Sequence, residues 1–132
     1  MKTIPDSHKD LLRDEKKAFA YLATVMKDGT PQVTPVWFNV EGDFIMINSA
    51  EGRVKDKNIR ANPAVAIAIA DPGDPYRYLQ IRGKVIEFTD KGADAHIDAL
   101  AFKYTGDPKY QWRTPNQKRI KYKIMVEKVD PH

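Results

Sequence analysis

Residues able to bind a charged ligand gather in one short basic segment of this chain, residues 52–63. Lys or Arg occupies four of eight successive positions there, at 53, 55, 57 and 60. The segment follows Gly52 and ends at Asn62-Pro63, which predicts a short helix whose first turn carries Arg53 and Lys55. A helix N-terminus presents unpaired N–H groups and the positive end of the helix dipole. With two cations added, the segment predicts a site for an anion, most simply a phosphate.

The same cations would also fit a solvated helix face that binds no ligand. The whole chain has 22 Lys and Arg against 18 Asp and Glu, a net charge of +4. This modest excess is compatible with an acidic small molecule, with nucleic acid, or with no partner at all. Nucleic-acid binding has nothing beyond this charge to support it, so we expect no nucleic-acid partner.

Other kinds of chemistry have little support in the sequence. There is no Cys, which excludes disulfides, thiolate catalysis and Cys-based metal sites. The three His residues are scattered at positions 8, 96 and 132, so no metal site is expected. No catalytic triad or pair of carboxylates is visible, and we name no catalytic acid or base.

The length of 132 residues fits a single domain, residues 1–132. No stretch approaches the roughly 18 apolar residues that span a bilayer. Residues 1–12 are too polar for a signal peptide. We therefore expect a cytoplasmic protein without a membrane partner.

The basic helix is expected to sit among short strands. Ser7 with Asp10 resembles a capping box and predicts a first helix over residues 7–17. Strands are predicted at 18–25, 32–40 and 44–49, and Asp28-Gly29 marks a hairpin, so that these three form a meander. Pro35 lies inside the second strand, which indicates a sheet edge, a bulge or a backbone that faces a ligand.

The second half of the chain continues the same pattern. Alternating apolar residues predict strands at 64–70, 76–88 and 120–126, with a bulge at Gly83. Apolar residues at 97, 100, 101 and 104 predict a helix over about 90–104. Helices link strands only once, which argues against a doubly wound sheet. The expected fold is therefore mainly β (α+β), a small antiparallel barrel of six strands with two to three short helices.

Three segments together carry a resemblance to a known family. They are Ala23-Thr24 with Asp28-Gly29-Thr30-Pro31-Gln32-Val33-Thr34-Pro35-Val36-Trp37-Phe38, then Gly52-Arg53-Val54-Lys55-Asp56-Lys57-Asn58 with Asn62-Pro63, and then Tyr78-Leu79-Gln80-Ile81-Arg82-Gly83-Lys84-Val85. In order and spacing the chain resembles the pyridoxamine 5′-phosphate oxidase-like superfamily of FMN-binding split β-barrels. It is most similar to the branch that uses the deazaflavin coenzyme F420.

The resemblance implies a six-stranded split barrel that forms a homodimer, with each cofactor in a groove at the subunit interface. It implies that the backbone of Pro35, Val36 and Trp37 faces the cofactor ring. It places Asn48, Ser49 and Ala50 near the cofactor tail. It assigns Arg53, Lys55 and Asn58 to the segment that holds the phosphate, with Lys55 the firmest match.

Several further residues have both a structural and a functional interpretation. Either Trp37 or Phe38 must point into the core, because they are adjacent on a strand. Trp112 has no evident core role and is a candidate to line or close the groove. Tyr104 is expected to pack and His96 to lie on the surface, whereas Tyr110 is a candidate to donate a proton or to stack on a substrate.

A second basic cluster lies near the C-terminus. Arg119, Lys121 and Lys123 would project from one face of the last strand, next to Lys118. They would either attract the polyglutamate tail of F420 or form a solvent-facing stripe. We favour the stripe.

We expect an oxidoreductase that binds coenzyme F420 and transfers a hydride from reduced F420 to a small-molecule organic acceptor of the quinone, biliverdin or unsaturated carbonyl type. One alternative keeps the fold and replaces F420 by FMN. Another is a non-catalytic carrier of F420, a flavin or a tetrapyrrole.

Overall fold

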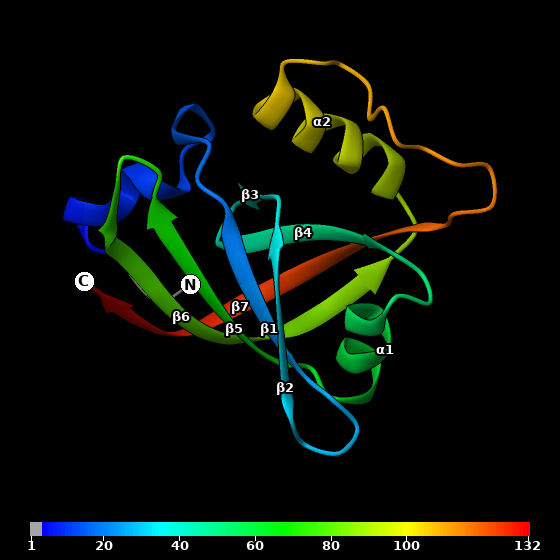
Figure 1. The fold of residues 1–132 in the computed structure, drawn as a ribbon, viewed down its shortest axis with the longest axis horizontal. Coiled ribbons are helices and arrows are strands. Elements are labelled where there is room, and N and C mark those ends of the chain that lie inside the picture. The colour runs from blue at the N-terminus through cyan, green and yellow to red at the C-terminus, as the bar shows by residue number, and fades with distance from the viewer. Residues whose placement is uncertain (1–3) are drawn as a thin grey trace.

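In the computed structural model, which describes residues 4–132, an antiparallel sheet of seven strands curls into a half-barrel (Figure 1). The strand order is β2-β1-β5-β6-β7-β4-β3. The strands span Ala20–Val25 (β1), Pro31–Val36 (β2), Phe38–Glu41 (β3), Phe44–Ala50 (β4), Ala64–Asp71 (β5), Asp74–Thr89 (β6) and Arg119–Pro131 (β7). The antiparallel split-barrel fold expected from the sequence is confirmed.

Helices connect the strands at one end of the half-barrel (Figure 1). Helix α1 (Val54–Ala61) follows β4, and helix α2 (Ala93–Thr105) joins β6 to β7. Both match the sequence prediction. No helix within residues 4–132 has the length and apolar character that a membrane crossing needs.

The predicted helix over residues 7–17 is wrong in kind. The chain instead forms the 3-10 segments η1 (Asp6–Leu12) and η2 (Asp14–Lys16), because Arg13 between them is extended. No capping box forms, since the Ser7 hydroxyl bonds the neighbouring His8 ring. The first three residues of the segment that we excluded as a signal peptide, 1–3, lie outside the described residues.

The predicted three-strand meander is also wrong. Trp37 divides the expected strand 32–40 into β2 and β3, which lie at opposite edges of the sheet, so the described chain has seven strands instead of six. Two separate hairpins result, β1–β2 and β3–β4. Pro35 pairs with Tyr21 on the edge strand β2, where its missing N–H removes no bond from a central ladder.

The inward face of the sheet carries the core. Alternate residues of β5, β6 and β7, among them Ile67, Ile81 and Ile124, are fully enclosed, as the alternation predicted. The predicted bulge is present, with a register shift between Arg82 and Gly83. A Cβ atom at Gly83 would collide with the carbonyl oxygen of Met125, so the close approach of β6 to β7 requires glycine there.

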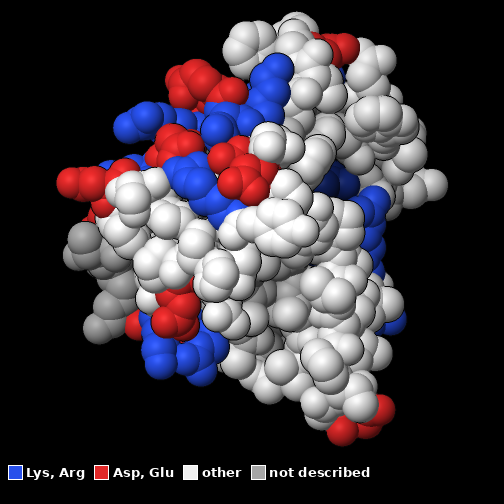
Figure 2. Space-filling view, turned by 60° about the vertical axis from the view of Figure 1, so that its left-hand side comes forward, with Lys and Arg blue, Asp and Glu red and all other residues white. Residues whose placement is uncertain are grey.

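The outward face of β1, β2 and β5 carries no charged side chain. Tyr21 lies between Pro35 and Ala68, and the next outward row places Ala23 between Val33 and Ala66. Figure 2 shows a broad face free of Lys, Arg, Asp and Glu above the tip of the β1–β2 hairpin. Val33 in this face is 64% exposed and Tyr21 is 44% exposed, and a contiguous exposed apolar patch of this kind often marks an interaction site.

Candidate functional site

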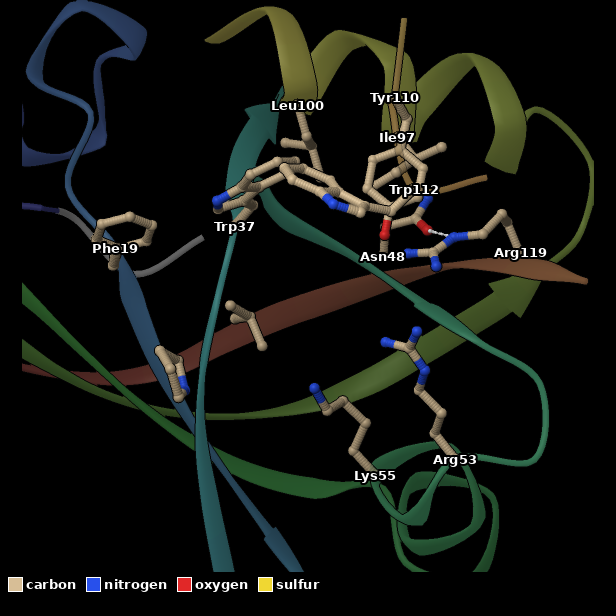
Figure 3. Close-up of a pocket in the computed structure, with 12 residues that line it drawn as sticks. Phe19, Trp37, Asn48, Arg53, Lys55, Ile97, Leu100, Tyr110, Trp112 and Arg119 are labelled. Carbon is tan, nitrogen blue, oxygen red and sulfur yellow. Dashed lines mark hydrogen bonds between the residues drawn. The ribbon is translucent and has the colours of Figure 1, made fainter. Parts of the chain in front are cut away.

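A pocket of about 330 Å³ opens between α1 and α2 at one end of the half-barrel (Figure 3). Its volume lies in the range of small-ligand sites, about 300–1,000 Å³. Its walls come from the residue before β1, the end of β2 and the β2–β3 junction, β4, the first turn of α1, α2, the loop before β7, and β7. The lining residues are Phe19, Pro35, Val36, Trp37, Asn48, Arg53, Lys55, Ile97, Leu100, Tyr110, Trp112 and Arg119.

The first turn of α1 supplies one cationic wall. Arg53 is the N-cap residue, and Lys55 follows in the first turn. Both side chains point from the helix into the pocket (Figure 3). Within residues 4–132 neither forms an ion pair with a carboxylate. Burial lowers the pKa of Lys55, and the nearby charges of Arg53 and Arg119 lower it further. A bound anion would relieve this repulsion.

Asp56, the acidic residue of the same turn, does not neutralise these cations. Its carboxylate accepts hydrogen bonds from the Gly52 N–H (2.9 Å), from Arg60 Nε (3.0 Å) and from the Tyr122 hydroxyl (2.5 Å). Burial opposes its ionisation, but these hydrogen bonds outweigh burial and lower the pKa of Asp56. The carboxylate thus fixes α1 to β7 and leaves the cations facing the pocket.

The opposite wall carries a third cation, Arg119 of β7. It is only 5% exposed, and within residues 4–132 it forms no ion pair with a carboxylate. Its Nε donates to Asn48 Oδ1 (2.8 Å), its Nη1 donates to Gln117 Oε1 (3.1 Å), and its guanidinium lies 5.1 Å from the Tyr110 ring centre. Burial lowers the pKa of Arg119.

His96 lies behind this wall, and the prediction that it is a surface residue is wrong. It is 6% exposed and contacts Asn48 Nδ2 through Nδ1 (3.1 Å) and Asn39 Oδ1 through Nε2 (2.9 Å). His96 belongs to the buried face of α2, which also includes residues 93, 97, 100 and 101. Burial, followed by the charges of Lys121 and Arg119, lowers the pKa of His96 to about 4, so the ring is neutral near pH 7.

Aromatic side chains form the remaining wall. Trp37 stacks on Tyr104 with ring centres 5.3 Å apart, and Tyr104 stacks in turn on Phe19 at 5.2 Å. Tyr110 and Trp112 approach Trp37 at 6.3 and 6.4 Å. Trp112 remains 63% exposed, so its ring surface is available to a ligand. A planar, partly apolar group would fit against these rings.

The sequence interpretation of the paired aromatics is confirmed. Phe38 is the residue that enters the core, and Trp37 faces the pocket. Tyr104 is packed as expected, because its hydroxyl donates to the Ala18 carbonyl (2.7 Å) and its ring lies between Phe19 and Trp37. Burial raises the pKa of Tyr104.

Most of the residues singled out in the sequence meet in this pocket. Those that line it are Pro35, Val36, Trp37, Asn48, Arg53, Lys55 and Trp112. Ser49 points to the opposite side of β4 from Asn48, and Ala50 is buried outside the lining. Asn58 donates to Thr24 Oγ1 (3.0 Å) and Met26 Sδ (3.2 Å), so it ties α1 to the β1–β2 hairpin and stays out of the lining.

Other lining residues escaped the sequence analysis. Phe19, Ile97 and Leu100 resemble ordinary core residues, and nothing in the sequence separates them from the core. Arg119 was grouped with Lys121 and Lys123 as a solvent-facing stripe. That grouping is wrong for Arg119, which is buried beside Asn48, while Lys121 and Lys123 pair with Glu41 and Glu87. The pairing of β7 with β4, which creates this difference, has no local signal in the sequence.

The described part of the chain contains no cluster of three or more His, Asp or Glu side chains able to hold a metal ion. The side chains that line the pocket offer recognition by cations, by aromatic faces and by the Asn48 amide.

The sequence profile of the family described as "Pyridoxamine 5'-phosphate oxidase" matches residues 4–131. A solved structure named "F420 Reductase" is similar to this chain at 33% identity and a TM-score of 0.85, covering 96% of this chain and 98% of that one. None of the curated proteins matches the chain.

More distant structures share the fold. HupZ from Group A Streptococcus has 24% identity and a TM-score of 0.67, covering 98% of this chain and 94% of its own. A conserved hypothetical protein from Mycobacterium tuberculosis has 22% identity and a TM-score of 0.74, covering 98% of this chain and 84% of its own.

Proposed function

This chain belongs to the pyridoxamine 5′-phosphate oxidase family, and we propose that it is an oxidoreductase that binds coenzyme F420 and passes a hydride from its reduced form to an organic acceptor. The observation that carries the proposal is the pair Arg53 and Lys55. Both face the pocket without an ion pair to any carboxylate of residues 4–132, and aromatic side chains line another wall of the same pocket. A ligand with a phosphate at one end and a planar ring at the other could contact both the cationic wall and the aromatic wall of the pocket.

The residues present fit such a cofactor. Arg53 and Lys55 would hold the phosphate, because charge-assisted hydrogen bonds to phosphate contribute about 1.5–3 kcal/mol each. Pro35, Val36 and Trp37 would face the ring, and Trp112 would cover it. Hydride transfer is the chemistry that the cofactor supplies when bound. The chain's own contribution is to bind the phosphate, orient the ring and restrict access of water.

Two cofactors share these features. FMN also has a three-ring system and a phosphate, so the pair Arg53 and Lys55 does not distinguish it from F420. The 33% identity to a structure named F420 reductase, over nearly the full length of both chains, favours F420.

The acceptor would be a flat, largely apolar molecule. Beyond the cations the pocket is bounded by Phe19, Trp37, Ile97, Leu100 and Trp112, which supply apolar and aromatic contacts. We propose a quinone, biliverdin or unsaturated carbonyl compound as the acceptor class.

We also propose that the protein works as a homodimer. The uncharged, mostly apolar composition of the outer face of β1, β2 and β5 supports an interface between copies. Pro35 belongs both to this face and to the pocket lining, so a second copy seated on the face would lie beside the pocket mouth.

The decisive experiment is a parallel titration of the purified protein with F420 and with FMN, followed by fluorescence. We expect tighter binding of F420. Reduced F420 is then offered with each acceptor class, and its oxidation is followed by absorbance. Tight binding without turnover on any acceptor would identify a cofactor carrier, whereas tighter binding of FMN would replace the proposed cofactor.

A further inference from the structure

We propose that Arg119 is a third anion ligand of the pocket, and that Asn48 and His96 are positioning residues that fix its guanidinium toward the bound anion. This inference rests on the proposed function for the identity of the natural ligand. Its geometric basis is independent of that identity.

Arg119 is a buried cation on which the Asp94 carboxylate, paired with Arg113, acts only from beyond ion-pair distance. Within residues 4–132 its guanidinium meets amide oxygens and an aromatic ring but forms no ion pair with a carboxylate. Burial of an unpaired charge is costly and buried charges are normally paired, so an anion bound in the pocket would supply the partner that Arg119 lacks. The Arg53 guanidinium and the Lys55 amine face the same space from α1 (Figure 3).

The guanidinium also keeps donors free. Arginine has five N–H donors in a planar fork. Nε is used by Asn48 and Nη1 by Gln117, and Nη2 has no hydrogen-bond partner within residues 4–132. Nη2 and the remaining Nη1 hydrogen are therefore available to an anion in the pocket.

The orientation of Asn48 follows from its partners. Arg119 can only donate, so the Asn48 atom that contacts it must be the carbonyl oxygen. The Ala93 carbonyl can only accept, so the atom that contacts it at 2.9 Å must be the amide nitrogen. Both contacts agree on one amide orientation, which turns the second amide hydrogen toward His96.

The protonation state of His96 follows from its two hydrogen-bond partners. Because Asn48 Nδ2 donates to Nδ1, that ring nitrogen must be unprotonated. The proton therefore resides on Nε2, which donates to Asn39 Oδ1 at 2.9 Å. A chain of directed hydrogen bonds thus runs from Asn39 of β3 through His96 and Asn48 to Arg119, and each member has one defined orientation.

The first test compares Arg119→Gln with Lys123→Gln, a control that removes a cation from the same strand outside the pocket. We expect Arg119→Gln to weaken F420 binding at least tenfold and Lys123→Gln to leave it unchanged. Arg119→Lys keeps the charge but loses the planar fork of donors, so its affinity for F420 should lie between those of the wild type and Arg119→Gln. This variant replaces Arg119→Gln in the test if the glutamine variant does not fold. Wild-type affinity in either Arg119 variant would overturn the inference.

Thermal unfolding in the presence of inorganic phosphate tests the role of Arg119 independently of the proposed function. Phosphate should raise the thermal unfolding midpoint of the wild type above that in chloride of equal ionic strength, and Arg119→Gln should reduce the rise. This comparison stands even if the wild type binds neither F420 nor FMN, a result that would contradict only the proposed function. An equal rise in both proteins would overturn the role of Arg119. Loss of F420 binding in Lys55→Ala with full binding in Arg119→Gln would leave the proposed function intact and remove this inference.

A double-variant cycle tests the positioning role of His96. His96→Phe removes both hydrogen bonds and should weaken F420 binding several-fold. His96→Gln has a side-chain oxygen that can accept a hydrogen bond from Asn48, so this variant should bind F420 more tightly than His96→Phe and more weakly than the wild type. If His96 acts through Arg119, the double variant His96→Phe/Arg119→Gln should bind no more weakly than Arg119→Gln alone. Weaker F420 binding by the double variant than by Arg119→Gln would show that His96 affects the structure in general, and it would overturn the positioning role.

Discussion

The Tyr122 hydroxyl donates a 2.5 Å hydrogen bond to Asp56 Oδ1 and thereby joins the last strand to the helix that carries the pocket cations. Tyr122 is fully buried, and Asp56 is nearly so. The position of Arg53 and Lys55 thus depends on a strand that lies more than 60 residues later in the chain.

Replacing Tyr122 by Phe should destabilise the fold. The change leaves a buried carboxylate with one donor fewer, a cost of about 1–3 kcal/mol. Urea denaturation should show a lower free energy of unfolding, with Tyr76→Phe as the control because Tyr76 is exposed. Equal stability of the two variants would contradict the anchoring role of this bond.

Lys55→Ala should weaken cofactor binding at least tenfold, because a charge-assisted contact to phosphate is lost. Fluorescence titration measures the affinity, and circular dichroism checks that the fold is retained. Lys57→Ala is the matched control, since Lys57 lies on the same helix outside the pocket lining. Unchanged affinity in Lys55→Ala would remove the phosphate site from α1.

The buried His96 should make stability depend on pH. Burial lowers its pKa from 6.5 to about 4 in the folded chain, so between these values the unfolded chain binds a proton that the folded chain does not. The contribution of His96 to the free energy of unfolding is therefore fully present above pH 6.5. It decreases as the pH falls toward 4, by at most about 1.4 kcal/mol per pH unit.

His96→Gln should lack this contribution. The difference in unfolding free energy between wild type and variant is expected to shrink from pH 7 to pH 4.5, as measured by urea denaturation at each pH. A difference that stays constant over this range would show that His96 does not titrate as its burial indicates.

The outer sheet face should be an interface between copies. Light scattering is expected to give a dimer for the wild type, and Val33→Glu should shift it toward monomer by placing a charge in that face. Phe102→Glu is the control, because Phe102 is similarly exposed, at 62%, but lies on α2. A wild-type monomer that still binds cofactor would refute the interface.

Gly83→Ala should destabilise the protein by about 1–3 kcal/mol, because the added Cβ forces β6 away from the Met125 carbonyl. Thermal unfolding measures the effect against Gly73→Ala, where an added Cβ would make only ordinary contact at 3.5 Å. Equal midpoints for the two variants would show that the bulge relaxes easily.

Local patterns in the sequence were sufficient for much of this fold. Alternation located the strands in β5, β6 and β7, helical spacing located α2, and Asn62-Pro63 marked the end of α1. Most of the predicted pocket residues also came together: Arg53 and Lys55 lie at the start of α1, and Pro35, Val36, Trp37 and Asn48 lie in the stretches 32–40 and 44–49 where strands were predicted.

Long-range pairing was not readable from the sequence. No local signal shows that Trp37 separates two edge strands or that β7 inserts between β6 and β4. The two errors at the site follow from this gap. His96 and Arg119 carry polar side chains that resemble surface residues until Asn48 is brought between them.

The position of β7 has a consequence for biosynthesis. Until the ribosome has released residues 119–131, β4 lacks its partner on one side, and the pocket lacks Arg119. A nascent chain exposes the first strands and α1 well before it can enclose a ligand. The pocket is therefore complete only after residues 119–131 have left the ribosome, and premature termination ahead of residue 119 would yield a product that lacks both the β7 partner of β4 and one wall of the pocket.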